Sequence, residues 1–270
     1  VVNGIAPDKG LYFPEEINPL PISFFENIES FSNEEIAFKA IQQFVSGIVP
    51  NDVLKDILKE VLDFDFPVVE ITPNIGTLEL FHGPTMAFKD LGVEGVNVVI
   101  LYPSGKVSDI QERQLTTLGK NITALEVDGT FDDCQAMVKN AFLDKELLDK
   151  MKLTSANSIN VARWLPQLFY FLFAYKQVKS KGKEIVFSVP SGNFGNICAG
   201  LVAQRLGMPV KHFIASTNVN DTVPQFMLTK EYNPKPSTAT ISNAMDVGDP
   251  SNFIRIRHLF KDDFEALKKN

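Results

Sequence analysis

The sequence predicts an α/β protein whose sheets are parallel, and two observations carry that prediction. Nearly continuous apolar runs occupy 96–103 and 184–190, as in strands that a parallel sheet buries on both faces. Around these runs, helical patterns alternate with further short strands at the spacing of βαβ units. A chain of 270 residues is long enough to bury the core of one large domain or of two smaller ones.

The first 75 residues are expected to form an N-terminal region of extended chain and helices. Residues 1–30 are rich in Pro, Gly and Asn, which favours an irregular lead-in. Ser32 and Glu35 have the spacing of a capping box, so a helix should begin there, and a second amphipathic helix follows it. Short strands are then predicted at 67–72 and 77–81.

The rest of the chain is expected to form a smaller lobe, residues 76–150, and a larger lobe, residues 151–270. In the smaller lobe, a polar helix connects the apolar strand at 96–103 with a strand at 122–128. Thr130 has an acidic residue three positions later and should cap the helix that comes next.

In the larger lobe, a long apolar helix runs to about Lys179, and a strand–helix–strand unit follows it. The strands of this unit are 184–190 and 210–216, and Gly207 should end the helix between them. From Asn218 onward the sequence is polar and rich in turn residues, so we expect irregular structure there.

Composition and charge exclude several classes of function. The net charge of −7 opposes binding to a nucleic-acid backbone, which needs a basic surface. The longest apolar run, 165–175, is too short to span a bilayer, so no membrane partner is expected. The two cysteines, Cys134 and Cys198, form no CxxC pair and fit free thiols of a cytoplasmic protein. The three histidines share no metal-ligand spacing, which predicts no metal site.

Lys89 is the first candidate for covalent chemistry. It follows Pro84, which suits the first turn of a helix, and the apolar residues 86–88. An ammonium group beside apolar side chains loses solvation, which lowers its pKa and makes the amine available for a Schiff base. The alternative is that Lys89 and Asp90 form an ordinary solvated pair on a helix surface.

The stretch SGNFGN, residues 191–196, is the second candidate. It connects a buried strand with a helix, and ligands of parallel sheets bind at the carboxyl ends of strands. Gly192 and Gly195 allow a tight turn whose N–H groups, with the helix N-terminus, would hold a phosphate. Phe194 would pack beside a flat ring. The alternative is a Gly-rich turn without a ligand.

The third candidate is a polar stretch with a planar arginine fork at its end. Ser155, Asn157, Ser158 and Asn160 offer hydrogen-bond donors, and the guanidinium of Arg163 suits a carboxylate or phosphate. The alternative is a loop that caps the following helix.

The chain resembles the threonine synthase family, in the branch typical of bacteria and fungi. Four stretches, in the order of the family, carry this resemblance: HGPTMAFKD, SANSIN, VPSGNFGN and TNVNDTVP. The resemblance implies the fold-type II architecture of pyridoxal 5′-phosphate enzymes, related to tryptophan synthase β chains, with two open parallel-sheet α/β lobes.

The resemblance also implies a set of site residues. Lys89 would carry the cofactor as a Schiff base and would be the catalytic residue. The cofactor phosphate would bind to six residues of the Gly-rich turn: Ser191, Gly192, Asn193, Phe194, Gly195 and Asn196. The substrate side would comprise Thr85, Ser155, Asn157, Asn160 and Arg163.

The implied reaction is a lyase reaction that converts O-phosphohomoserine and water into L-threonine and phosphate. The expected partner is this small molecule, and the chain would be a monomer or a homodimer. Once released from the cofactor, Lys89 would move protons at Cα and Cβ of the substrate.

Three other functions stay open. A relative with the same scaffold would act as a phospho-lyase or dehydratase on another amino acid, and a degenerate relative would bind the cofactor without turnover. A dinucleotide-binding domain is a more distant alternative, because residues 191–196 lack the GxGxxG spacing.

Two departures from the family stand out. After Gly92 the family continues with a helix, a strand and a Ser-Gly-Asp-Thr-Gly loop, whereas here the apolar strand follows almost at once. The family also extends beyond the position of Asn270 and has a short N-terminal lead. A βαβ crossover needs a dozen or more residues. We therefore expect that the chain as given omits segments rather than that the protein has lost them.

Overall fold

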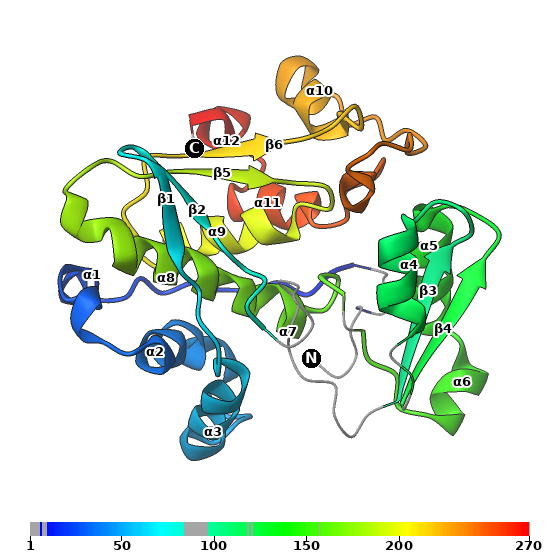
Figure 1. Ribbon diagram of the computed structural model, residues 1–270, viewed down its shortest axis with the longest axis horizontal. Helices are drawn as coiled ribbons and strands as arrows, with labels where there is room; N and C mark the ends of the chain where they lie inside the picture. The colour runs from blue at the N-terminus through cyan, green and yellow to red at the C-terminus, as the bar shows by residue number, and fades with distance from the viewer. Residues whose placement is uncertain are drawn as a thin grey trace.

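The computed structural model describes residues 6, 10–83, 97–117, 119, 121–155 and 157–269. Its sheets and helices confirm the α/β prediction, because both βαβ units contain a parallel strand pair. Figure 1 shows the long helix α8 (Leu168–Val178) between the N-terminal helices and the strand pair β5–β6. No helix in this part of the chain has the length and apolar character needed to cross a membrane.

The N-terminal region contains three helices and a hairpin. The helices are α1 (Ile22–Glu26), α2 (Asn33–Val45) and α3 (Asn51–Val61), with a 3₁₀ turn η1 (Ile28–Ser30) after the first. The predicted capping box is confirmed: Glu35 N donates to Ser32 Oγ at 3.2 Å, and Ser32 N donates to the Glu35 carboxylate at 2.8 Å.

The hairpin pairs β1 (Val68–Thr72) with β2 (Ile75–Leu78) in antiparallel register. The second strand begins two residues earlier than predicted and ends at Leu78. The reason is the tight turn, because Thr72 pairs directly with Ile75 and the ladder has to start there.

The smaller lobe contains the parallel pair β3 (Val98–Pro103) and β4 (Ile122–Val127), with Val98 opposite Ile122. Its helices are α4 (Asp109–Thr116), α5 (Phe131–Ala141) and α6 (Lys145–Lys150). The prediction that β3 is buried on both faces is wrong, since Val99 is 61% exposed. Among the described residues β3 pairs with β4 alone, so one face and one edge lack cover.

The larger lobe begins with helix α7 (Val161–Trp164), the 3₁₀ turn η2 (Leu165–Gln167) and α8, and 3₁₀ turn η3 (Lys179–Lys181) follows. Pro166 lies in η2, at the start of the long apolar helix, and does not kink it. The strand–helix–strand unit is β5 (Val186–Pro190), α9 (Gly195–Arg205) and β6 (His212–Ser216), with the two strands parallel. Gly207 follows the last turn of α9 with φ +109°, as its predicted terminal role requires.

The C-terminal stretch departs most from the prediction. The region expected to be irregular contains α10 (Thr222–Thr229), η4 (Asn243–Met245), α11 (Phe253–Leu259) and α12 (Phe264–Lys269). These helices are short, and tertiary packing stabilises them. The rings of Phe226 and Phe253, for example, lie 5.3 Å apart and join α10 to α11.

One hydrophobic cluster joins the N-terminal helices with α7, α8, α9 and α11. No described residue between 97 and 150 belongs to this cluster. The smaller lobe accordingly lies to one side in Figure 1, away from β5 and β6. The domain boundaries at 76 and 151 remain predictions.

Candidate active site

The Gly-rich turn, residues 191–196, lies where the sequence places it, between the carboxyl end of β5 and the first turn of α9. Its own polar groups fix its shape. Ser191 N donates to Ser216 O of the neighbouring strand at 2.8 Å, and the buried Ser191 hydroxyl donates to Val189 O at 2.9 Å. Asn196 Nδ2 donates back across the turn to Pro190 O at 2.7 Å. Both Ser191 donors are therefore committed to the turn itself.

Five successive backbone N–H groups of the turn are left without an acceptor in the described chain. They belong to Gly192, Asn193, Phe194, Gly195 and Asn196. The N-terminus of α9 adds its partial positive charge at the same place. Such an array of donors at a helix N-terminus binds a phosphate or carboxylate without a cationic side chain.

Phe194 gives the turn its bend. It is the N-cap of α9 and has φ +59° and ψ 12°, a left-handed conformation that costs a non-glycine residue about 1 kcal/mol. Its buried ring packs edge-on against Phe253, with ring centroids 5.9 Å apart. Core packing therefore accounts for the aromatic side chain that the sequence suggested as a neighbour of a flat ligand ring.

The two glycines of the turn are needed for a different reason than expected. The left-handed residue of the turn is Phe194, whereas Gly192 and Gly195 lie against other segments. A Cβ at Gly192 would come within 2.7 Å of Met245 Cα, and a Cβ at Gly195 within 2.9 Å of Ser158 Cβ. Close approach of neighbouring chain, and not a positive φ, excludes a side chain at these positions.

The polar loop, residues 155–160, lies directly beside the turn through the contact between Ser158 and Gly195. Within the loop, Asn157 N donates to Ser155 Oγ at 3.1 Å, and Ser158 N donates to Asn157 Oδ1 at 2.7 Å. These bonds leave the Asn157 side-chain nitrogen as a donor with no partner in the described parts of the chain.

Asn160 and Arg163 stand at the start of α7. Asn160 is the N-cap: its Oδ1 accepts from Ala162 N at 3.0 Å, and its Nδ2 donates to Thr154 Oγ1 at 3.1 Å. The capping alternative is thus confirmed for Asn160. Arg163 lies in the first turn of α7, and burial holds the pKa of its guanidinium below the ordinary value.

Thr85 and Lys89, which the sequence assigns to the same site, lie outside the described residues. The structure brings the other predicted residues together into two adjacent elements, the turn and the polar loop.

Known proteins share the sequence pattern and the fold of this chain. Residues 1–61 match the family described as "Threonine synthase N terminus". Threonine synthase of Escherichia coli K12 is 38% identical to all of this chain, which covers 72% of that protein. Threonine synthase of Haemophilus influenzae is 41% identical over 97% of this chain and 70% of its own length.

The chain belongs to the threonine synthase family. The crystal structure of the Escherichia coli enzyme superimposes with a TM-score of 0.93 over 99% of this chain and 72% of that one. A pyridoxal-phosphate-bound threonine synthase from Brucella melitensis gives a TM-score of 0.82 at 32% identity, covering 99% of this chain and 68% of its own. Both the resemblance and the fold-type II architecture predicted from the sequence are therefore confirmed.

The alignment with the Escherichia coli relative is longer than this chain. It extends over 307 positions in the Escherichia coli comparison, whereas this chain has 270 residues. The relative therefore has residues inside the matched stretch that have no counterpart here. Gly92 itself lies outside the described residues.

Sequence reasoning missed two residues that contact the site, Asn252 and Arg255. Both lie where α11 begins, in the stretch interpreted as irregular, and both are buried. Asn252 donates to Ser158 in the polar loop and to Asn193 in the turn. Nothing in the sequence distinguished them, because an arginine or asparagine in a polar stretch is ordinarily a solvated residue.

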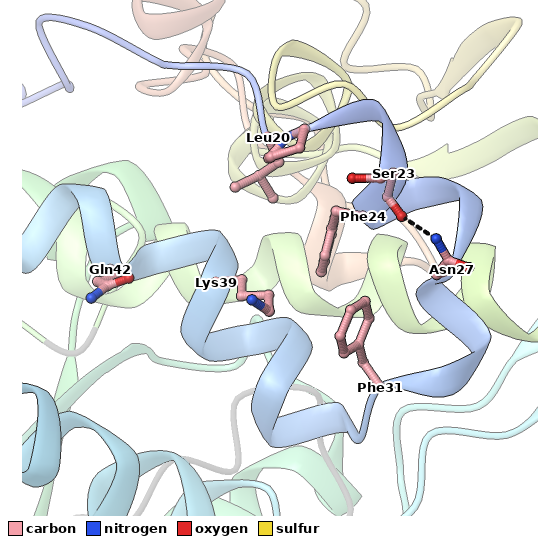
Figure 2. Close-up of a pocket in the computed structure, with 8 residues that line it drawn as sticks. Leu20, Ser23, Phe24, Asn27, Phe31, Lys39 and Gln42 are labelled. Atoms are coloured by element: carbon pink, nitrogen blue, oxygen red, sulfur yellow. Dashed lines mark hydrogen bonds between the residues drawn. The ribbon is translucent and has the colours of Figure 1, made fainter.

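A cavity of about 490 Å³ lies elsewhere, on the N-terminal helices (Figure 2). It is lined by Leu20, Pro21, Ser23, Phe24, Asn27, Phe31, Lys39 and Gln42. None of the predicted site residues lines it, and one cation, Lys39, stands 5.4 Å from the Phe31 ring. The described residues contain no cluster of metal-ligating side chains.

Proposed function

We propose that the chain has the function of its family, the pyridoxal-phosphate-dependent synthesis of L-threonine. The substrate would be O-phosphohomoserine, which reacts with water to give threonine and phosphate. The observation that carries this proposal is the row of five N–H groups in the turn that have no acceptor among the described residues, because the cofactor of the family is anchored through a phosphate.

The residues of the turn fit the phosphate group of pyridoxal 5′-phosphate. A phosphate dianion has more acceptor sites than one side chain can satisfy, and the five N–H groups together with the α9 dipole supply the donors. Ser191 would act through the shape of the turn, because its own donors already bind Ser216 O and Val189 O. When bound, the cofactor supplies an electron sink for the carbanion formed next to the substrate amine.

Lys89 would hold the cofactor covalently and afterwards move protons at Cα and Cβ of the substrate. The apolar residues before it in the sequence would keep its amine available in the uncharged form. This assignment rests on the AFKD motif.

The substrate would be held on the side of the polar loop. Asn157 offers its amide nitrogen, which has no partner in the described parts of the chain, and Ser155 offers a hydroxyl beside it. Arg163 would bind an anionic group of the substrate with its planar fork, and partial burial would strengthen that attraction. Thr85 joins this group on the family motif alone, and Asn160 would orient the loop by capping α7.

As part of this proposal, the chain would be a cytoplasmic enzyme and either a monomer or a homodimer. Two buried free thiols, Cys134 and Cys198, support the reducing compartment.

The experiment that tests the function compares wild-type protein with Lys89→Ala and with a control, Lys106→Ala. Wild type and the control should absorb visible light after addition of pyridoxal phosphate, and borohydride reduction should label the peptide that contains Lys89. Lys89→Ala should lose the absorption, the label and threonine formation together. Threonine formation by Lys89→Ala would overturn the assignment.

The reaction products distinguish a threonine synthase from a related lyase that acts as a dehydratase. Release of phosphate with threonine supports the proposal, whereas release of phosphate with a keto acid would indicate a dehydratase. Visible absorption without any turnover would indicate a cofactor-binding relative that has lost activity.

A further inference from the structure

We propose that Asn252 and Arg255 are positioning residues that fix the polar loop against the anion-binding turn, and so couple the substrate side of the site to the phosphate side. This inference deepens the proposed function and rests on it.

Asn252 contacts both elements at once. It is 0% exposed, its backbone N–H donates to Asn193 O in the turn at 3.3 Å, and its Nδ2 donates to Ser158 Oγ in the polar loop at 2.9 Å. The preceding residue, Ser251, donates from its backbone N–H to Asn193 Oδ1 at 2.6 Å. Two consecutive backbone N–H groups therefore hold Asn193, whose own N–H is one of the five anion donors.

Arg255 holds the other side of the loop. Its guanidinium donates to Ser158 O at 2.5 Å, to Ile159 O at 2.7 Å and to Tyr12 O at 3.0 Å. It also donates to Asn252 Oδ1, which keeps that side chain oriented toward Ser158. The planar fork thus joins the loop, the start of α11 and the N-terminal lead in one arrangement.

Burying the charged side chain of Arg255 costs more free energy than a role in packing alone would explain. It is 1% exposed, and among the described residues its hydrogen-bond acceptors are neutral oxygens and not carboxylates. Burial lowers the pKa of its guanidinium to about 10, which reflects the cost of desolvating the charge. An apolar side chain of similar volume would fill the same space at lower cost, whereas it would orient neither Asn252 nor the loop.

The contacts of Gly195 show that the turn and the polar loop are packed too closely to move independently. Gly195 touches Ser158 and Asn252, with 3.2 Å between a Cβ at Gly195 and Asn252 Nδ2. A shift of Ser158 would therefore move the first turn of α9, where two of the anion donors, Gly195 and Asn196, lie. Loss of the Asn252 amide should loosen the phosphate side even though Asn252 donates nothing to the phosphate.

The test compares the affinities of two probes, pyridoxal 5′-phosphate and pyridoxal, which differ only in the phosphate. Wild type should prefer the phosphorylated probe strongly. Asn252→Ala should reduce the affinity for pyridoxal phosphate about tenfold, as expected for one buried hydrogen bond, and should leave the affinity for pyridoxal unchanged. A residue that only stabilises the fold would change both affinities alike or neither.

Three further variants complete the design. Ser158→Ala removes the same hydrogen bond from the other side and should give the same selective loss, which makes it the deciding variant if Asn252→Ala fails to fold. Arg255→Lys should keep the charge without the fork and show the same loss. Arg257→Ala is the matched control, an arginine on the same helix whose Nε bonds Asp262 at 2.7 Å outside the site, and it should retain the wild-type preference.

The outcomes separate this inference from the proposed function. Wild type that shows no preference for pyridoxal phosphate over pyridoxal would overturn the proposed function. Wild type with the preference, and Asn252→Ala or Ser158→Ala with the same preference, would overturn the positioning role alone.

Discussion

Gly195 and Ser158 lie in direct contact, with no space between them for a side chain. A Cβ at Gly195 would be 2.9 Å from Ser158 Cβ and 3.1 Å from Ser158 Oγ. Residue 195 opens the helix that presents the anion donors, and residue 158 belongs to the loop that would face the substrate. The anion-binding turn and the polar loop are therefore packed as one unit, so a substitution in either element should alter the geometry of the other.

The first prediction is that Gly195→Ala impairs anion binding more than it impairs folding. The added methyl group has to displace Ser158 or the start of α9, and either movement disturbs the N–H groups of the turn. We expect the affinity for pyridoxal phosphate to fall at least about tenfold, equivalent to about 1.4 kcal/mol. A titration followed by absorption or by thermal shift measures the change.

Gly200→Ala is the matched control for that prediction. It lies on the same helix, and its Cβ would come within 2.7 Å of the Phe213 ring and 2.8 Å of the Phe171 ring. This variant should lose stability through overpacking and keep its affinity for pyridoxal phosphate. Equal losses of affinity in both variants would refute the special role of the Gly195 contact.

The second prediction concerns pH. Burial, Asp249 and Asp133 together raise the pKa of Asp132 above its ordinary value of 3.8. The folded state therefore binds more protons than the unfolded state in the window just above pH 3.8, so stability falls as pH rises through it. Asp132→Asn should consequently raise the melting temperature at pH 7, by about 1 °C for a partly exposed group, and lose this advantage below the window.

Thermal unfolding of Asp132→Asn and wild type at pH 7 and at the lowest pH that keeps the protein folded measures this effect. Asp63→Asn, an exposed loop position, serves as control and should change little at either pH. An advantage of Asp132→Asn that is constant over the whole range would contradict the electrostatic explanation.

Local signals were enough to predict several parts of the molecule. The capping box of Ser32 and Glu35 spans four residues. The turn at 191–196 lies between a strand and a helix whose hydrophobic patterns are clear in the sequence. Such features depend on groups close together in sequence, which a single chain displays directly.

The role of α11 was not predictable in this way, because it depends on contacts over long sequence distances. Asn252 lies 94 residues from Ser158, and Ser251 lies 58 residues from Asn193. In sequence, Arg255 looks like a charge that prefers solvent, and only the carbonyl groups gathered around it explain its burial. The core position of the Phe194 ring was missed for the same reason, since Phe253 is its partner.

The third prediction concerns the start of α2. Ser32→Ala removes one half of the capping box and leaves Glu35 N without its acceptor. It should cost about 1 kcal/mol of stability, or roughly 2–4 °C in melting temperature for a chain of this size. The control is Ser46→Ala at the other end of the helix. The Ser46 side chain makes no hydrogen bond within the described chain, so this substitution should leave the stability almost unchanged. Equal melting temperatures for the two variants would refute the contribution of the cap.

The fourth prediction concerns the two cysteines. Cys198 is 0% exposed on α9, and burial raises the pKa of its thiol to about 12. Cys134 is buried on α5, and burial likewise raises the pKa of its thiol above the ordinary value. Because the thiolate is the reactive form and both cysteines are buried, a disulfide reagent at pH 8 should label neither residue in the native protein.

Denaturant should expose both thiols, giving two equivalents of label per chain. Under mild destabilisation Cys134 should react first, since the smaller lobe lies outside the main hydrophobic cluster that encloses Cys198. Peptide mapping by mass spectrometry after short labelling times identifies the order, and Cys134→Ser isolates the signal of Cys198. If Cys198 reacted as fast as Cys134 under mild destabilisation, α9 would open far more readily than its packing in the main hydrophobic cluster allows, and the rigid support that the anion-binding turn needs would be absent.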